Sequence, residues 1–167
     1  MEMEVVSATS THPLYTLLLL RPACGDGAQL PDMLPGQFVQ VAVPDAPHTF
    51  LRRPISINYV DRAAGTMALL VRRAGEGTAR LCDLKEGASL NIVLPLGRGF
   101  SIPERQTGRL VLAGGGVGIA PLYFLGCVLS KMGFNPEFIV GARSEADLLQ
   151  LCLLYTSPSP RDRTRSR

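Results

Sequence analysis

Leu51-Arg52-Arg53-Pro54-Ile55-Ser56-Ile57 is the stretch around which the rest of the chain is organised. It places two guanidinium groups side by side, then a proline, then a hydroxyl between two β-branched residues, and this pattern is typical of a strand. Arginine is seldom buried without a partner, and its planar fork suits a phosphate or pyrophosphate. The stretch therefore predicts a strand that carries a phosphorylated ligand. An exposed strand with two solvated arginines is the alternative for this stretch taken alone.

Short β-rich or alternating segments surround this strand, and turns rich in glycine, proline or aspartate separate them. The segments expected to form strands are residues 2–9, 13–21, 50–60, 66–72 and 89–93, together with the alternating stretch that follows the Pro35-Gly36 turn and ends at Val41. Six short strands with turns at these intervals favour a six-stranded antiparallel barrel over a βαβ unit.

A glycine-containing turn, Ala74-Gly75-Glu76-Gly77-Thr78, lies between the last two of these strands and precedes a short helical segment. Its two glycines relieve steric crowding, and Thr78 is expected to cap the helix. Backbone N–H groups would then point outward toward an anion. A common turn into a helix with no ligand is the alternative.

The periodicity changes after residue 106. Residues 109–113 form a continuous apolar strand, Gly114-Gly115-Gly116-Val117-Gly118 makes a turn, and residues 119–132 are expected to be a helix with Pro121 in its first turn. A second strand at 138–141 and a helix from Ser144 follow. This order predicts the first part of a doubly wound parallel sheet. Two strands cannot complete such a sheet, which indicates a truncated domain.

The glycine turn differs from the Gly-x-Gly-x-x-Gly dinucleotide fingerprint, and no acidic residue follows at the expected place for a ribose. Its arrangement of strand, glycine turn and helix is still suited to a nucleotide phosphate. A tight strand-to-helix turn with nothing bound is the alternative.

The net charge of +3 lies entirely in the last seven residues, and residues 1–160 carry 13 basic and 13 acidic groups. We therefore expect no nucleic-acid binding. Residues 152–167 have the look of a translated sequencing-adapter scar, with a natural disordered basic tail as the alternative.

The apolar runs are too short to span a bilayer, and an acidic N-terminus without a signal pattern favours a soluble, cytoplasmic protein with no membrane contact. The four cysteines are scattered, with no metal-ligand spacing: Cys24, Cys82, Cys127 and Cys152. His12 and His48 lie in proline-containing loops, and no nucleophile–base pattern is evident. We expect no catalytic residue and no metal site.

In this order the motifs resemble the ferredoxin-reductase-like flavoprotein superfamily, in which an antiparallel FAD barrel precedes a nicotinamide-nucleotide domain. Four motifs are most similar to the electron-transfer subunits of type B, NAD-linked dihydroorotate dehydrogenase, and the likeness covers residues 1 to about 150. They are Arg53-Pro54-Ile55-Ser56, Gly77-Thr78, Pro95-Leu96-Gly97-Arg98-Gly99-Phe100 and Gly114-Gly115-Gly116-Val117-Gly118-Ile119-Ala120-Pro121.

The resemblance implies two sets of cofactor-binding residues. FAD would be held by Arg53, Pro54, Ile55, Ser56, Leu70, Val71, Arg72, Gly77 and Thr78. NAD would be held by Gly114, Gly115, Gly116, Gly118 and Pro121, with Gly141 to Ser144 at the border of the same cleft.

Individual roles follow from the same resemblance. Arg53, Gly77 and Thr78 would grip the FAD pyrophosphate, and Ser56 would lie near the redox-active edge of the flavin. Ile55 stands where the superfamily commonly has an aromatic residue, a departure shared with the dihydroorotate dehydrogenase subunit.

The implied domains are an FAD barrel at 1–103, a truncated NAD domain at 107–151 and the tail at 152–167. The implied function is an oxidoreductase subunit that passes electrons from a partner dihydroorotate dehydrogenase through FAD, and a [2Fe-2S] cluster in the full-length protein, to NAD+ in pyrimidine biosynthesis. The cluster's four C-terminal cysteines are not in this sequence. A flavin subunit of a sulfide dehydrogenase or of an NADH-dependent ferredoxin reductase is the nearest alternative, and an interaction module without flavin is a second.

Overall fold

The computed structural model describes residues 1–23, 29–44 and 49–142. The helix expected from Ser144, the tail at 152–167, Cys24, His48, Arg143 and Cys152 lie outside the described residues. The described elements, in chain order, are β1 (Glu2–His12), β2 (Tyr15–Pro22), β3 (Phe38–Val41), β4 (Arg53–Asp61), β5 (Thr66–Arg72), α1 (Glu76–Cys82), β6 (Ser89–Leu96), β7 (Leu110–Gly115), a 3-10 turn (Gly116–Gly118), α2 (Ile119–Lys131) and β8 (Pro136–Gly141).

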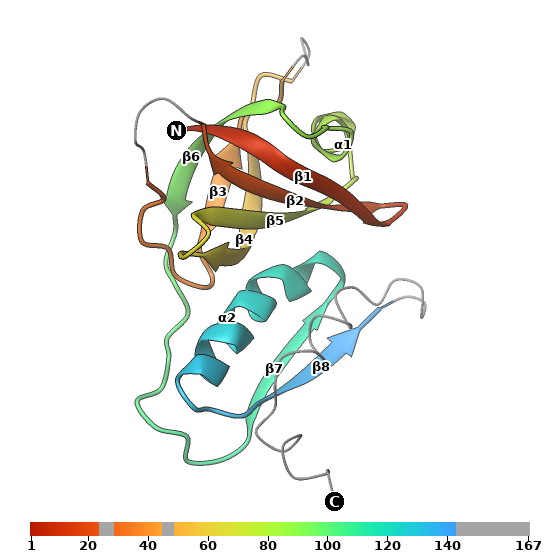
Figure 1. The fold of residues 1–167 in the computed structure, drawn as a ribbon. Coiled ribbons are helices and arrows are strands. Elements are labelled where there is room, and N and C mark those ends of the chain that lie inside the picture. The colour runs from red at the N-terminus through yellow and green to blue at the C-terminus, as the bar shows by residue number, and fades with distance from the viewer. Residues whose placement is uncertain (24–28, 45–48, 143–167) are drawn as a thin grey trace, which may run out of the picture.

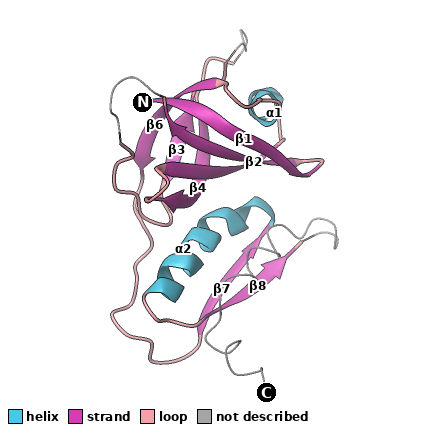
Figure 2. Cartoon of the chain, viewed as in Figure 1, coloured by secondary structure: helices cyan, strands magenta, loops and turns pink. Residues whose placement is uncertain are grey.

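The first six strands close into an antiparallel barrel in the order β1-β2-β5-β4-β3-β6, with β6 pairing back to β1 (Figures 1 and 2). The six-stranded barrel predicted from the sequence is therefore confirmed. Several strand boundaries differ from the prediction, among them the start of β4 and the end of β6. β4 begins at Arg53 because Arg53 is the first residue with a partner in β3, namely Val41, and β6 continues to Leu96 because that residue pairs with Phe38.

Alternation along the strands fills the barrel with branched apolar side chains. On β5, Met67, Leu69 and Val71 point into the core, and each is fully buried. Full burial of such a side chain stabilises the fold by about 1.5–3 kcal/mol. Leu81 of α1 joins the same core and fastens the short helix to the barrel.

A second unit follows the barrel, in which β7 and β8 pair in parallel and α2 packs on them (Figure 1). This strand–turn–helix–strand order confirms the predicted start of a parallel α/β sheet. α2 covers one face of the sheet, where Leu112, Leu125 and Leu129 are buried together. On the other face Val111 and Ile139 are 42% and 61% exposed.

The two units pack directly on each other, because α2 lies between the barrel and the β7–β8 sheet (Figure 1). The ring of Tyr59 on β4 lies 6.0 Å from that of Phe124 and 5.9 Å from that of Tyr123. Leu70 on β5 is 1% exposed and packs with Ile119 at the start of α2. This contact explains why β5 is buried on both of its faces.

Candidate functional site

Arg53 and Gly77 lie directly against each other at the start of β4 and of α1. A Cβ atom built on Gly77 would lie 2.6 Å from Nε of Arg53 and 3.2 Å from Cγ2 of Thr49. Such a Cβ would need the Arg53 side chain to move, so the absence of a side chain at residue 77 lets the guanidinium reach the backbone of α1. We call Thr49, Arg53 and Gly77 the arginine–glycine site.

The neighbouring Arg52 is used differently. Its guanidinium donates hydrogen bonds to the carbonyl of Asn91 at 2.9 Å, to that of Gln40 at 3.4 Å and to the side-chain oxygen of Asn91. It therefore ties β4 to β3 and β6. Among the described residues, no hydrogen bond or ion pair engages the Arg53 guanidinium, so Arg53 is the member of the pair with donors to offer a ligand.

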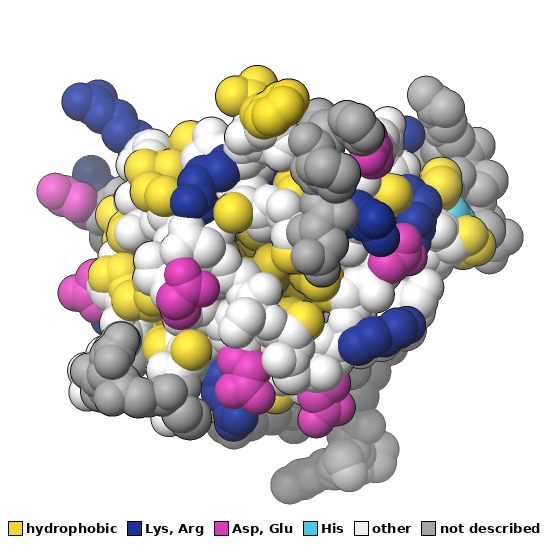
Figure 3. Space-filling model, turned by 90° about the horizontal axis from the view of Figure 1, so that it is seen from above, with side chains coloured by type: hydrophobic (Ala, Val, Ile, Leu, Met, Phe, Trp, Pro, Cys, Tyr) yellow, Lys and Arg dark blue, Asp and Glu magenta, His cyan; other side chains and the backbone are white. Residues whose placement is uncertain are grey.

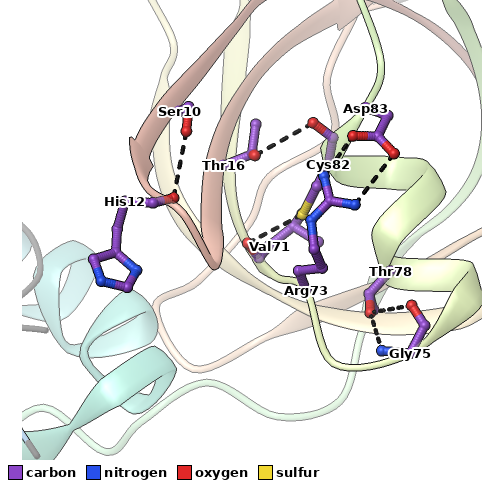
Figure 4. Close-up of polar contacts among 9 residues, drawn as sticks. All are labelled: Ser10, His12, Thr16, Val71, Arg73, Gly75, Thr78, Cys82 and Asp83. Carbon is purple, nitrogen blue, oxygen red and sulfur yellow. Dashed lines mark hydrogen bonds and ion pairs between the residues drawn. The ribbon is translucent and has the colours of Figure 1, made fainter.

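The turn before α1 is closed by Thr78 (Figure 4). Its hydroxyl oxygen accepts hydrogen bonds from the N–H groups of Ala74 at 2.9 Å and Gly75 at 3.1 Å, and the hydroxyl donates to the Gly75 carbonyl at 3.1 Å. Thr78 takes part in capping α1, as expected, but not from the N-cap position. Gly75 occupies that position, because its carbonyl already accepts the hydrogen bond of Ala79, and Thr78 lies in the first turn, where its hydroxyl accepts the N–H of Gly75.

The far end of α1 is fastened to β2 and β5 (Figure 4). Arg73 donates two hydrogen bonds to the carboxylate of Asp83, one of them at 3.2 Å, and this contact holds the pKa of Asp83 below its ordinary value. The Thr16 hydroxyl donates to the carbonyl of Cys82 at 3.3 Å. Cys82 is part of the barrel core, and burial raises the pKa of its thiol.

The residues expected to meet the flavin lie where β4 and β5 part. The register between these strands ends where Ile57 lies opposite Leu69. Beyond that point residues 53–56 pair with β3, and residues 70–72 pair with β2. Within the described strands, the facing edges of these two segments are not paired with each other, so their backbone groups are free to meet a planar ligand.

Side chains at this opening divide into two groups. Ile55 and Val71 belong to the barrel core, and Leu70 is buried beneath α2, so these three have only backbone to present. Pro54 and Arg72 are exposed, and Ser56 is half-buried on the outer face of β4. The side chains available to a ligand at this opening are therefore those of Pro54, Ser56 and Arg72.

An open pocket of about 630 Å³ lies between the barrel and the second unit. We call it the interdomain pocket. Its lining comprises Leu14, Tyr15, Arg72, Ala113, Gly114, Gly115, Gly116, Ile139, Gly141 and Ala142. Arg72 is the charged residue in this lining, so the pocket combines one guanidinium with the backbone of a glycine turn.

The glycine turn is shaped by close contacts on each side. A Cβ atom on Gly114 would lie 2.6 Å from Cδ1 of Leu122, and one on Gly115 would lie 3.1 Å from the carbonyl oxygen of Gly141. Gly116 has a φ of +52°, which disfavours other residues. Gly118 ends the 3-10 turn and Pro121 lies in the first turn of α2, and neither is among the described residues that line the pocket.

Leu14 and Tyr15 in the lining were not singled out from the sequence. Tyr15 pairs with Arg72 in the β2–β5 register, and its hydroxyl lies 3.5 Å from the position of a Cβ on Gly116. The antiparallel pairing of residues 13–21 with residues 66–72 was the signal that could have identified Tyr15. An aromatic residue that starts a strand antiparallel to 66–72 is placed beside Arg72.

The described residues hold no group of three or more His, Cys, Asp or Glu side chains able to bind a metal ion. Cys82 lies in α1 and Cys127 in α2, as expected from the sequence. No described helix has the length and apolar character needed to cross a membrane.

Over the aligned residues, this chain is more than one-third identical to several curated proteins. It is 38% identical over 150 residues to the electron transfer subunit of dihydroorotate dehydrogenase B (NAD(+)) of Listeria innocua, a match covering 87% of this chain and 56% of that protein. It is 41% identical over 116 residues to the subunit of the same name from Desulforamulus reducens, covering 70% and 44%. The chain thus spans about half the length of the curated relatives it matches. No family model matches it.

Solved structures share its fold. Phthalate dioxygenase reductase superposes with a TM-score of 0.78 at 21% identity, covering 94% of this chain and 48% of the other. The structure of an NADH-dependent reduced ferredoxin-NADP oxidoreductase superposes with a TM-score of 0.70 at 29% identity, covering 87% and 50%.

Proposed function

Because the chain is a homologue of the electron-transfer subunit of dihydroorotate dehydrogenase B and has the ferredoxin-reductase-like FAD/NAD fold, we propose that it binds FAD and passes electrons between a partner dihydroorotate dehydrogenase and NAD+. In the cell this would be a cytoplasmic step of pyrimidine biosynthesis, carried out within a hetero-oligomer. Residues 1–103 would form the flavin domain, and 107–151 the start of the NAD domain.

The observation that carries the proposal is the contact between Arg53 and Gly77. A guanidinium and a bare stretch of backbone meet where no described side chain pairs with the guanidinium. Two groups that can donate hydrogen bonds side by side suit a pyrophosphate, which has acceptor oxygens on two adjacent phosphorus atoms. FAD carries a pyrophosphate and FMN does not.

The opening between β4 and β5 supports the position of the flavin ring. Residues 54–56 and 70–72 present unpaired strand edges there, and the Ser56 hydroxyl faces outward beside them. FAD supplies the redox chemistry, since it exchanges electrons in pairs or singly. The chain's own residues would orient the ring through the unpaired backbone groups at this opening.

The interdomain pocket supports the position of NAD(H). Gly114, Gly115 and Gly116 expose backbone at the end of β7, and Arg72 places a positive charge across the pocket. These groups favour an anionic pyrophosphate. Gly141 and Ala142 at the end of β8 complete the described part of this wall. A nicotinamide nucleotide bound here would lie next to the flavin opening, because Arg72 belongs to both sites.

The [2Fe-2S] cluster belongs to the proposal for the whole protein only. Such a cluster needs four thiolates. The described cysteines, Cys82 and Cys127, lie on different helices and are buried and half-buried, so they do not fit, and we assign them no role in electron transfer.

The proposal is tested by flavin titration of the 167-residue chain. Arg53→Ala should lower the affinity for FAD by about 10-fold to 100-fold and the affinity for FMN much less, because charge-assisted hydrogen bonds contribute about 1.5–3 kcal/mol. Gly77→Ala should act in the same direction by displacing the arginine side chain, which is flexible, so the melting temperature should change little.

Gly75→Ala is the matched control, since a Cβ there meets nothing within 4 Å and its φ is −172°. Equal loss of FAD and FMN on Arg53→Ala would remove the pyrophosphate assignment. A colourless protein that binds neither flavin would favour the interaction module.

The second candidate is the flavin subunit of an NADH-dependent ferredoxin reductase or a sulfide dehydrogenase. The 29% identity to the ferredoxin-NADP oxidoreductase structure favours it. Reduction of the whole protein by NADH, followed by transfer to either ferredoxin or a dihydroorotate dehydrogenase subunit, separates the two. Transfer to ferredoxin alone would select this second function.

A further inference from the structure

Phe50 and Leu51 stand out of the barrel next to the arginine–glycine site. Phe50 is 92% exposed and Leu51 is 74% exposed, the largest values among the large apolar side chains described. Charged and apolar side chains are interspersed on the face seen from above, where some apolar groups protrude (Figure 3). Leaving a whole phenylalanine in water forgoes the free energy that burying it would give, so a role outside the core is expected.

The two residues that flank this segment, Thr49 and Arg53, both lie beside Gly77. The chain advances at most about 3.6 Å per residue, so Phe50 is within one residue of the arginine–glycine site from Thr49 and within three from Arg53. Phe50 therefore stands at the edge of the proposed pyrophosphate site.

The direction of β4 separates the two halves of a dinucleotide. Ser56 and the opening toward β5 lie on the C-terminal side of Arg53, and Phe50 lies on its N-terminal side. With the flavin at the opening and the pyrophosphate at Arg53, the second nucleoside leaves toward residue 50. The exposed groups there are an aromatic ring and an aliphatic side chain, neither of which has a hydrogen-bonding group in its side chain.

We propose that Phe50 is the stacking platform for the adenine base of the bound FAD. This inference rests on the proposed function and assigns its second subsite. An aromatic ring stacks on a purine through the faces of both π-systems, and such contacts contribute about 1–3 kcal/mol per base in single-stranded nucleic-acid complexes. Recognition is by shape and stacking only, so the subsite selects for a flat base and carries no hydrogen-bond code.

The test is flavin titration of the 167-residue chain and its Phe50 variants with FAD and FMN. Phe50→Ala should lower the affinity for FAD by about 5-fold to 100-fold. The affinity for FMN, which has no adenine, should equal that of the unmodified chain. Phe50→Trp should retain or strengthen FAD binding. Leu51→Ala is the matched control for removing an exposed apolar side chain, and it should leave both affinities unchanged.

Competition by ADP gives a second readout, in which the competing ligand itself carries no flavin. ADP should displace FAD from the unmodified chain, and Phe50→Ala should raise the ADP concentration required by the same factor. An unmodified chain that binds FAD while Phe50→Ala keeps its FAD-to-FMN ratio would overturn the adenine subsite and leave the flavin function standing. A chain that binds neither flavin would overturn both.

Discussion

The arginine–glycine site and the interdomain pocket are both built on glycine turns that lead into helices, but they depend on different parts of the fold. Arg53, Thr49 and Gly77 belong to one closed barrel and its short helix. The pocket takes Leu14, Tyr15 and Arg72 from the barrel and its glycines from β7. The first site therefore needs only the barrel to fold, whereas the second also needs α2 to dock.

The two sites also differ in what lies against their glycines. At the first site Gly77 has no side chain, and the Arg53 side chain fits against its backbone. At the second site the missing side chain of Gly115 lets the ends of β7 and β8 approach each other. The Gly141 carbonyl oxygen lies 3.1 Å from where a Cβ on Gly115 would be. The same residue type thus serves a ligand-facing charge in one turn and close backbone packing in the other.

The largest expected effect separates the two sites through their packing. Leu70→Ala should lower the free energy of unfolding by about 2–5 kcal/mol, because it removes a side chain that is 1% exposed between β5 and α2. The preference for FAD over FMN should persist, since the arginine–glycine site does not include Leu70. Urea unfolding and flavin titration measure the two quantities.

Leu69→Ala is the matched control on the same strand. Leu69 is fully buried inside the barrel. This variant should therefore lose about as much stability as Leu70→Ala, and its affinity for both flavins should also fall. If Leu70→Ala abolished the FAD preference while Leu69→Ala kept it, the proposed independence of the two sites would be wrong.

The next effect tests the two adjacent arginines. Arg52→Ala should cost about 1–3 kcal/mol of stability, because it leaves the Asn91 oxygens without their charged donor. It should leave the FAD-to-FMN ratio unchanged. Arg53→Ala should do the reverse, so a double comparison by thermal unfolding and flavin titration assigns one arginine to the fold and the other to the ligand.

The smallest effect concerns the packing between the units at high pH. Burial in the interface raises the pKa of Tyr123 to about 12 from 10.0. Between these values the unfolded chain has lost the phenolic proton and the folded chain keeps it, so stability should fall as pH rises from 10 to 12. Tyr123→Phe should flatten this dependence. The measurement is the urea midpoint at each pH, and an equal slope in both proteins would contradict the assignment.

Much of the architecture was predictable because its causes are local. Alternation of apolar residues, as in Thr66 to Arg72, indicates a strand whatever the partner, and that strand has the predicted bounds. The switch to a continuous apolar strand followed by five residues rich in glycine predicted β7 and α2. Residues 54–56 and 70–72 were grouped from the resemblance, and the structure brings both segments to one opening.

Other features required pairing information that the sequence does not contain. The sequence presents Arg52 and Arg53 as equivalent, and only the closure of β6 onto β3 brings Asn91 within reach of the first. Threonine is a common N-cap residue, but α1 has Gly75 at its N-cap, and Thr78 lies three residues later, in the first turn. Leu14 and Tyr15 became part of the pocket through the hairpin register.

The sequence alone determined which segments are strands, where the chain changes from antiparallel barrel to parallel sheet, and which glycines and arginines merit attention, because each of these depends on neighbours a few residues away. The tertiary structure decided which arginine offers its donors to a ligand, which glycine faces a side chain and which faces backbone, and how Thr49 and Arg53 come to lie beside Gly77. These depend on contacts between residues up to a hundred positions apart, such as Tyr15 with Gly116. Such contacts arise only when the barrel closes and α2 packs against it.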